Sequence, residues 1–273
     1  MAKVTVLGCG HVGSTLCYAL VAANAVDELV ILNRTMSRAE GEAADLRHAA
    51  ALVERNIRIE AGGLAESAGS DVIAFTASVP TPKNMTSRNE LAEGNLGLLK
   101  EWIPALAEAS PDAIFVMITN PVEAMSYYAW KLSGLRSRQF IGTGTLIDSA
   151  RWRSMLSQYL GIHADDVRAY ILGEHGDTQF PALSVSATGG KKIDADPMIY
   201  QLFERSRGAG LAVYQKKGYT NYAISQAATL MIQTVLRDGK RTIPISTYVE
   251  DYYGISDVFL SVPAVVGHAG VLR

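Results

Sequence analysis

Cysteine is scarce in this chain of 273 residues, which contains only Cys9 and Cys17. Two thiols this close in the sequence cannot build a disulfide framework, and their spacing matches no thiolate metal site. The sequence therefore excludes the small secreted proteins that disulfides hold together, and we expect a reducing compartment and no bound metal. We interpret both cysteines as packing residues near the first helix.

The chain also lacks long apolar runs. No run reaches the roughly 20 residues that a membrane-spanning helix needs, although hydrophobic residues make up 48% of the sequence. The first residues, Met1 to Lys3, lead straight into an apolar strand without a charged and then apolar leader. We therefore expect no membrane partner and a cytoplasmic location.

An excess of positive charge is missing as well. The 25 lysines and arginines are balanced by 27 aspartates and glutamates, which gives a formal net charge of -2. Binding a polyanion usually needs a basic face, so we expect no nucleic-acid partner. What remains is the composition of an ordinary globular protein that is long enough for two domains.

Apolar segments and helical segments alternate through the first half of the chain. We expect strands at 4–7, 29–32, 71–76, 113–119 and 139–141. Helical patterns fill the intervals, among them 12–24, 37–52 and 88–109. Continuous apolar strands that alternate with helices are typical of a parallel sheet covered on both faces. The predicted fold class is α/β, with a Rossmann-type doubly wound parallel sheet.

The pattern changes after Gly142, and we place a domain boundary there. We expect a dinucleotide-binding domain over 1–142 and a mixed α+β substrate and catalytic domain over 143–273. The second part shows a helix from about 147, strand-like segments at 167–172 and 182–187, helical patterns at 197–217 and 222–237, and an antiparallel strand pair at 242–248 and 259–263. Enzymes of this kind bind ligands outside the carboxyl ends of the parallel strands.

A glycine-rich turn joins the first expected strand to the first expected helix. Its sequence is Gly8-Cys9-Gly10-His11-Val12-Gly13. The first glycine permits the tight turn, the second lets a pyrophosphate approach the backbone, and the third allows close packing of helix and strand. The helix N-terminus adds a partial positive charge. A GxGxxG run alone is a weak signal, but in this context it predicts a dinucleotide site rather than a merely structural turn.

The end of the second expected strand indicates which dinucleotide is bound. NAD-binding chains usually carry Asp or Glu there for the adenosine ribose, whereas this chain has Asn33-Arg34-Thr35. These side chains can all donate to a phosphate, and the run from Asn33 to Glu40 resembles the NADP-binding loop of shikimate dehydrogenases. We therefore favour NADP(H) over NAD(H). The alternative is a solvated turn in which Thr35 or Ser37 caps the next helix.

The segment Gly173-Glu174-His175-Gly176-Asp177 is the clearest sign of chemistry. An imidazole can give or take a proton near neutral pH, and a carboxylate partner holds its tautomer and stabilises its charged form. Asp148 is the candidate partner. It precedes Arg151 by three residues, so both side chains leave one face of a helix. Asn120 follows a parallel strand, where active-site residues collect.

These residues stand in an order that resembles the L-lactate and malate dehydrogenase family over nearly the whole chain. The matching stretches after the glycine turn are Asp45-Leu46, Thr119-Asn120-Pro121-Val122, Ile141 to Arg151, Gly173 to Asp177 and Lys217-Gly218-Tyr219-Thr220. The resemblance implies hydride transfer between a nicotinamide and C2 of a 2-oxo or 2-hydroxy acid. It is closest to the L-lactate and L-2-hydroxyisocaproate side of the family.

The resemblance also implies a role for each matching residue. His175 corresponds to the proton donor and Asp148 to its carboxylate partner. Arg151 corresponds to the clamp on the substrate carboxylate. Arg88, carried by a lid-like loop, corresponds to the residue that polarises the substrate carbonyl, and Asn120 also bonds near that carbonyl. The residues matched to the cofactor site are Gly8, Gly10, His11, Val12, Gly13, Asn33, Arg34, Thr35, Thr76, Ala77, Asn95, Thr119 and Asn120.

Three positions bear on which acid is bound. Malate enzymes of the family carry an arginine in the lid where Thr81 stands here, and Gly210 replaces the usual alanine of lactate enzymes. Both small residues leave room for a longer side group, and Thr220 matches the lactate side. We favour a monocarboxylic 2-oxo acid, pyruvate or a larger homologue, with malate dehydrogenase as the alternative.

The chain departs from the family pattern in three places. Ser78 replaces a glycine in the turn after the fourth strand, and Glu123 stands where an aspartate usually follows Asn-Pro-Val. The third departure is the end of the chain at Arg273, because family members continue with another strand and a long helix. We therefore expect the substrate domain to lack that C-terminal helix.

A catalytically silent dinucleotide-binding protein is the alternative from another functional class. It would need the glycine turn but not the four side chains of the presumed chemistry, and the presence of all four favours an enzyme. Those four are His175, Asp148, Arg88 and Arg151. Helical segments at 39–52 and 222–237 match interface elements of the family, so we expect a homodimer or a homotetramer.

Overall fold

One nine-stranded sheet runs through the molecule. The computed structural model describes residues 1–80 and 88–273, and for residues 88 and 89 it describes the backbone only. The strands of the sheet are β1 (Lys3–Leu7), β2 (Glu28–Leu32), β3 (Arg58–Gly62), β4 (Val72–Phe75), β5 (Ile114–Met117), β6 (Phe140–Gly142), β12 (Arg241–Val249), β13 (Val258–Gly267) and β14 (Gly270–Val271). The strand order is β14-β13-β12-β6-β5-β4-β1-β2-β3. The six strands from β6 to β3 are parallel, which confirms the predicted doubly wound α/β class.

Helices cover both faces of this sheet. The helices on one face are α1 (His11–Ala22), α2 (Met36–Ala50) and α8 (Tyr222–Leu236). On the other face, the 3-10 turn η1 (Arg88–Leu91) leads into α4 (Ala92–Ala109), which packs beside α5 (Val122–Ser133). The four-residue helix α3 (Leu64–Ser67) links β3 to β4. Within the described residues, no helix has both the length and the apolar content to cross a bilayer.

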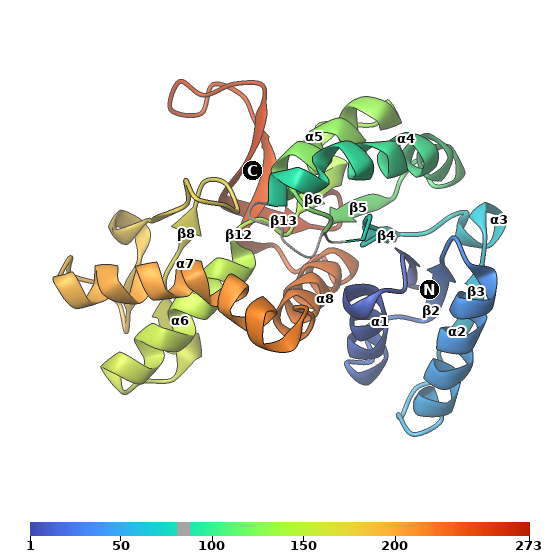
Figure 1. Cartoon of the computed structure of the whole chain (residues 1–273), viewed down its shortest axis with the longest axis horizontal. Coiled ribbons are helices and arrows are strands. Elements are labelled where there is room, and N and C mark those ends of the chain that lie inside the picture. Colours follow the sequence, from blue (N-terminus) through green and yellow to red (C-terminus); the bar gives the residue numbers. More distant parts are fainter. Residues whose placement is uncertain (81–87) are drawn as a thin grey trace.

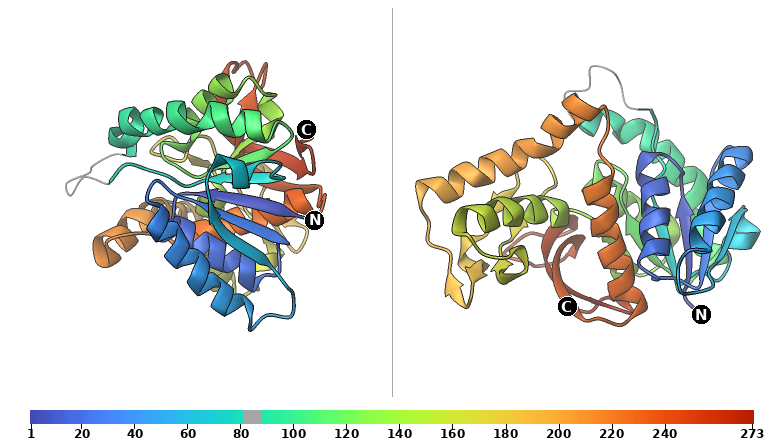
Figure 2. Two further views of the ribbon diagram at one scale, coloured as in Figure 1. Left: turned by 90° about the vertical axis from the view of Figure 1, so that its right-hand side faces the viewer. Right: turned by 90° about the horizontal axis from the view of Figure 1, so that it is seen from below.

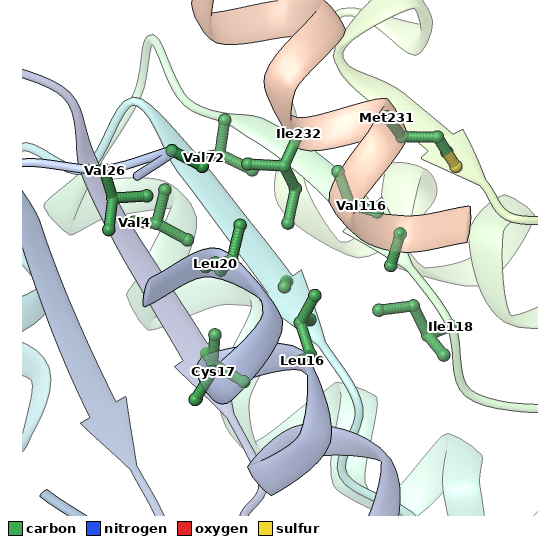
Figure 3. Close-up of a cluster of buried hydrophobic side chains, with 14 of the residues drawn as sticks. Val4, Leu16, Cys17, Leu20, Val26, Val72, Val116, Ile118, Met231 and Ile232 are labelled. Atoms are coloured by element: carbon green, nitrogen blue, oxygen red, sulfur yellow. The ribbon is translucent and has the colours of Figure 1, made fainter. Parts of the chain in front are cut away.

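Two apolar cores hold the helices to the sheet. Figure 3 shows part of the first core, in which Leu16 and Leu20 of α1 meet Ile232 of α8 over the sheet residues Val4 and Val72. The second core fills the opposite face with aromatic and aliphatic side chains of the central strands, α4 and α5. Its members include Phe75, Leu99, Phe115, Val122 and Met125. Burial on both faces explains why the central strands are continuous apolar runs.

The remaining elements form a smaller lobe beside the sheet. It contains α6 (Leu146–Leu160) and α7 (Pro197–Lys217), which pack around Trp152, Leu156 and Phe203. Figures 1 and 2 both show α8 between α1 and this lobe. Two small sheets complete it, one of β7 (Val167–Arg168), β10 (Ala187–Thr188) and β11 (Lys191–Lys192), the other of β8 (Ile171–Leu172) and β9 (Phe180–Pro181). Three further 3-10 turns are η2 (Ser137–Gln139), η3 (Ala164–Asp166) and η4 (Leu183–Val185).

The bounds of α7 match the prediction, and its caps explain why. Asp196 accepts hydrogen bonds from the backbone N–H groups of Met198 and Ile199, and Pro197 occupies the first helical position. At the other end, Gly218 adopts a left-handed φ of 85°, which suits glycine and stops the helix. Start and stop signals of this kind can be recognised in a sequence.

The predictions of two strands were wrong, and one strand was missed. The strand expected at 167–172 is split between two sheets, because the N–H groups of Tyr170 and Ile171 donate to the hydroxyls of Ser186 and Ser149 instead of to a neighbouring strand. The strand expected at 182–187 contains the turn η4, and only its last residue, Ala187, belongs to a strand. The edge strand β3 was not predicted, because its sequence Arg-Ile-Glu-Ala-Gly shows no apolar run.

The C-terminal strand pair is antiparallel, as predicted, but it does not belong to a separate sheet. Ser246 of β12 pairs with Gly142 of β6, so the main sheet continues across the expected domain boundary. The division into 1–142 and 143–273 remains a prediction.

Candidate active site

The glycine turn between β1 and α1 is built by close backbone contacts. A Cβ atom at Gly13 would lie 1.8 Å from the carbonyl oxygen of Gly8, and one at Gly8 would lie 2.8 Å from the backbone nitrogen of Ala77. The Thr76 hydroxyl donates to the carbonyl groups of Leu7 and Gly8. A Cβ at Gly10 would meet nothing within 4 Å. The turn is therefore closed toward the protein and open at Gly10, which fits a pyrophosphate at the N-terminus of α1.

Asn33 ties the end of β2 to this turn. Its side-chain oxygen accepts from the backbone N–H of Cys9 at 3.4 Å, and its amide nitrogen donates to the carbonyl of Thr35 at 3.1 Å. Arg34 and Thr35 are exposed. Thr35 precedes α2 but makes no side-chain capping bond, which removes the capping interpretation for this residue.

The loops after β4 and β5 are joined by buried polar side chains. The oxygen of Asn95 accepts from Val79 N–H at 2.8 Å, and its amide donates to the carbonyl of Asn120 at 2.7 Å. The Thr119 hydroxyl donates to the carbonyl of Ala77 at 2.7 Å. These expected cofactor residues thus stand at the carboxyl edge of the sheet, where their side chains fix the loops beside the glycine turn.

Two of the residues expected to carry the chemistry, His175 and Arg151, meet at a third, Asp148. One of its oxygens contacts Nδ1 of His175, and the other accepts from Nη1 of Arg151 at 2.8 Å. The side chain of Asp148 is 1% exposed, that of His175 is 8% exposed and that of Arg151 is 15% exposed. The structure brings together the three side chains that the sequence paired, and it adds an ion pair between Asp148 and Arg151.

A small pocket of about 70 Å³ opens beside this triad. Its lining combines expected substrate residues with one residue of the glycine turn: Val12, Ile118, Asn120, Thr143, Ile147, Arg151, His175, Thr220 and Ile224. A larger cleft of about 940 Å³ lies at the opposite edge of the sheet, since Ala2, Asp71 and Gln139 directly precede β1, β4 and β6. We place the candidate active site at the small pocket because His175 and Arg151 line it.

An aromatic contact joins the glycine turn to the substrate side of this pocket. The ring of His11 stacks on that of Tyr219, with centroids 3.7 Å apart and planes 5° from parallel. Lys217 places its ammonium group 4.5 Å from the Tyr219 centroid. Each ring is adjacent in sequence to a pocket residue, Val12 in one case and Thr220 in the other.

Gly210 lies against Arg151. A Cβ at Gly210 would be 3.1 to 3.3 Å from the guanidinium atoms of Arg151. A methyl group at this position would therefore press on the guanidinium, and the expected effect of Gly210 on the substrate side group stays a prediction. Thr81 lies outside the described residues, as does the side chain of Arg88.

Sequence reasoning noted Glu123 as a departure from the family and gave it no role. Its carboxylate accepts from the backbone N–H of His175 at 3.1 Å and from the hydroxyl of Ser261 at 3.4 Å. Burial raises the pKa of Glu123 from 4.5 to about 7, and the nearby negative charge of Glu174 adds to this rise. The one available signal was its position directly after Asn120-Pro121-Val122, at the edge where site residues collect.

Two family descriptions match the chain. Residues 2–142 match the lactate/malate dehydrogenase NAD-binding domain, and residues 145–273 match the lactate/malate dehydrogenase alpha/beta C-terminal domain. An L-lactate dehydrogenase from Synechococcus sp. (strain JA-3-3Ab) is 39% identical, with 99% of this chain and 90% of that protein covered. One from Moorella thermoacetica is 34% identical, with 98% and 88% covered.

Solved structures agree with these relatives. A minor L-lactate dehydrogenase from Enterococcus mundtii has a TM-score of 0.95 at 30% identity, and the match covers 100% of this chain and 89% of that one. A lactate dehydrogenase from a Medee basin deep-sea metagenome library also has a TM-score of 0.95, at 33% identity, with 100% and 90% covered. Both share the fold along the whole chain.

The matched NAD-binding description supports NAD(H) as the cofactor and gives no support to the predicted preference for NADP(H). The family order of motifs, the fold and the triad at the pocket agree with one another. The chain therefore belongs to the lactate/malate dehydrogenase family, on its L-lactate dehydrogenase side, and is an oxidoreductase.

Proposed function

We propose that this protein is an L-2-hydroxyacid dehydrogenase that interconverts a monocarboxylic 2-oxo acid and its 2-hydroxy acid, either pyruvate and lactate or a larger homologous pair. One observation carries the proposal. His175, Asp148 and Arg151 form one chain of contacts at a pocket that also reaches Val12 of the glycine turn. The reaction needs a proton donor and an anion-binding cation beside a dinucleotide cradle, whereas a protein that merely bound a dinucleotide would need neither group.

His175 acts as the proton donor in the direction of reduction. Asp148 holds its Nδ1, so Nε2 transfers the proton to the carbonyl oxygen of the 2-oxo acid. The buried carboxylate stabilises the imidazolium before the transfer and fixes the neutral tautomer after it. A bound nicotinamide dinucleotide supplies the hydride for C2 in reduction and accepts it in oxidation. In oxidation, His175 takes the proton of the substrate hydroxyl.

Arg151 binds the substrate carboxylate. A guanidinium has five N–H donors in a planar fork, and the bond from Nη1 to Asp148 uses one of them. Donors on the same fork suit a two-pronged pair with a carboxylate at the pocket. Following the family resemblance, we assign the polarisation of the carbonyl to Arg88. An Arg151→Lys substitution should then raise KM for the acid most, whereas Arg88→Lys should lower kcat most.

Small residues set the preferred acid in this proposal. Following the family resemblance, we assign the choice of acid to the small residues Thr81 and Gly210, and Thr220 lines the pocket beside His175. Gly210 acts through Arg151, because a methyl group there would press on the guanidinium and shift the carboxylate that it holds. A Gly210→Ala variant should therefore shift the preference toward the smallest 2-oxo acids.

The cofactor preference is a separate part of the proposal. We infer that the chain accepts NADP(H) as well as NAD(H), because Asn33, Arg34 and Thr35 present no carboxylate to repel a 2′-phosphate and Arg34 is exposed. An Asn33→Asp substitution should favour NADH over NADPH, since it adds a negative charge at the end of β2.

One experiment tests both parts. Pyruvate, longer 2-oxo monocarboxylic acids and oxaloacetate are each reduced with NADH and with NADPH, and kcat/KM is measured for every pair. The proposal expects turnover of the monocarboxylic acids with both cofactors. A strong preference for oxaloacetate would favour malate dehydrogenase, and no turnover of any acid would favour a silent dinucleotide-binding protein.

We also propose that the chain assembles as a homodimer or homotetramer. One large aromatic side chain is exposed on each of α1 and α8, Tyr18 at 59% and Tyr222 at 72% exposure. Light scattering on the purified protein measures its mass in solution, and a monomer would contradict this part.

A further inference from the structure

A carboxylate that the proton transfer does not use lies directly behind the His175 loop. Glu123, in the first turn of α5, accepts the backbone N–H of His175 at 3.1 Å through Oε1. The same oxygen accepts the hydroxyl of Ser261 at 3.4 Å. Glu123 thus binds the loop that carries the proton donor, although Glu123 itself does not line the pocket.

Ser261 of β13 extends this contact to α6. Its hydroxyl oxygen accepts the backbone N–H of Thr145, which caps α6, at 2.9 Å. Its backbone exchanges hydrogen bonds with Gly173 at 2.9 and 3.0 Å, two residues before the histidine. The loop with His175 and the helix with Asp148 are therefore both fixed to the same serine, and Glu123 binds that serine as well.

We propose that Glu123 is a positioning residue for the proton-transfer histidine. Glu123 holds the His175 loop to Ser261, so that the imidazole keeps its contact with Asp148. This inference rests on the proposed role of His175 as proton donor. It differs from that role because Glu123 acts on the backbone of the loop and exchanges no proton with the substrate.

The charge of Glu123 determines how strongly it holds the loop. An ionised carboxylate accepts an N–H more strongly than a neutral carboxyl group does. The charged groups around it are Glu174 and His175 on its loop side, with Asp148 and Arg151 of α6 beyond the imidazole, while β13 presents the uncharged Ser261. Because the pKa of Glu123 is raised to about 7, the contact strengthens as the pH rises through neutrality.

The first test compares Glu123→Gln with the unchanged protein across pH. Glutamine has the shape of the protonated glutamate and still offers an oxygen to the His175 N–H. We expect kcat/KM to be equal for the two proteins at about pH 6 and about fivefold lower for the variant at about pH 8. The matched control is Glu108→Gln, the same change at an exposed position of α4, which should leave the profile unchanged. A constant ratio across this range would overturn the proposal.

The second test does not depend on turnover. In a His175→Asn variant no imidazole titrates at position 175, and the amide proton there still faces Glu123. We expect its NMR shift to titrate with a midpoint at about pH 7 and to become flat when Glu123→Gln is added. A flat titration before that addition would overturn the positioning role. Absence of turnover in every 2-oxo acid assay would instead overturn the proposed function and leave this titration standing.

Discussion

The two ends of the candidate active site are built in different ways. The nucleotide end is a backbone structure made by one continuous segment, Gly8 to Gly13, closed against Thr76 and Ala77. The chemical end is a side-chain structure, in which α6 supplies Asp148 and Arg151 and a distant loop supplies His175.

Because of this difference, the two ends tolerate different kinds of substitution. Contacts made by backbone atoms depend on the absence of side chains, so an added methyl group breaks them while most polar changes nearby do not. Contacts made by side chains from separate elements depend on the charge and reach of each group, so an isosteric change can stop the chemistry and leave the fold intact. Substitutions can therefore disable either end alone.

The largest expected effect is at the chemical end. Replacing His175 with Asn should lower kcat for 2-oxo acid reduction by about a thousandfold, because the proton donor is lost. The dissociation constant of the reduced cofactor, followed by its fluorescence, should stay unchanged because the glycine turn is intact. A comparable loss of cofactor affinity would show that the two ends are not separable in this way.

The next effect is at the nucleotide end. A Gly13→Ala substitution places a methyl group 1.8 Å from the Gly8 carbonyl, so it should lower the free energy of unfolding by about 1–3 kcal/mol and abolish cofactor binding. Gly10→Ala is the matched control, since its methyl group meets nothing within 4 Å. It should weaken cofactor binding without lowering the melting temperature. Equal melting temperatures for both variants would contradict the described turn.

The same difference explains how much the sequence predicted. Residues 8–13 are local, and each glycine has a reason that can be stated from spacing, so the dinucleotide turn was predictable. The parallel sheet was also predictable, because its buried strands are continuous apolar runs. The split of 167–172 was not predictable, because it depends on Ser149 and Ser186, which are separate from this segment in the sequence. The edge strand β3 was not predictable because its sequence shows no apolar run.

At the chemical end, the sequence singled out three side chains that the structure brings together, but it did not predict all their contacts. The helical spacing of Asp148 and Arg151 indicated one shared face, and the structure adds that they bond to each other. The network of Glu123 and Ser261 joins positions 138 residues apart, which no local pattern contains. The contact of Gly210 with Arg151 was not predicted either, since the two residues lie on different helices.

A third prediction concerns the pH dependence of stability. The pKa of Glu123 is higher in the fold than its ordinary value of 4.5, because burying the ionised carboxylate costs more than its stronger hydrogen bond to His175 gives back. Its contribution to stability is therefore complete below about pH 4.5 and is lost as the pH rises through about 7. Relative to Glu123→Gln, the unchanged protein should lose about 1–3 kcal/mol of unfolding free energy across this window. Urea titrations at a series of pH values measure the difference. A gap that stays constant with pH would show that the carboxylate does not titrate there.

The smallest expected effect is at the contact that joins the two ends. His11 belongs to the glycine turn and Tyr219 precedes Thr220, and their stacked rings should couple by about 0.5–1.5 kcal/mol. A double-mutant cycle with His11→Ala and Tyr219→Leu measures this coupling as the non-additive part of the unfolding free energy. Tyr219→Phe keeps the ring and should keep the coupling.

The unchanged protein, the two single variants and the double variant also show whether this contact couples substrate binding to cofactor binding. If the stack holds the turn to the substrate side, His11→Ala should raise KM for the 2-oxo acid although His11 does not line the pocket. Tyr219→Leu should likewise weaken cofactor binding although Tyr219 lies outside the turn. Each variant could instead alter only its own end, with the effects of the double variant equal to the sum of the two single effects. That result would mean that the backbone-built and side-chain-built ends are independent. Coupled effects would mean that this ring stack is where they meet.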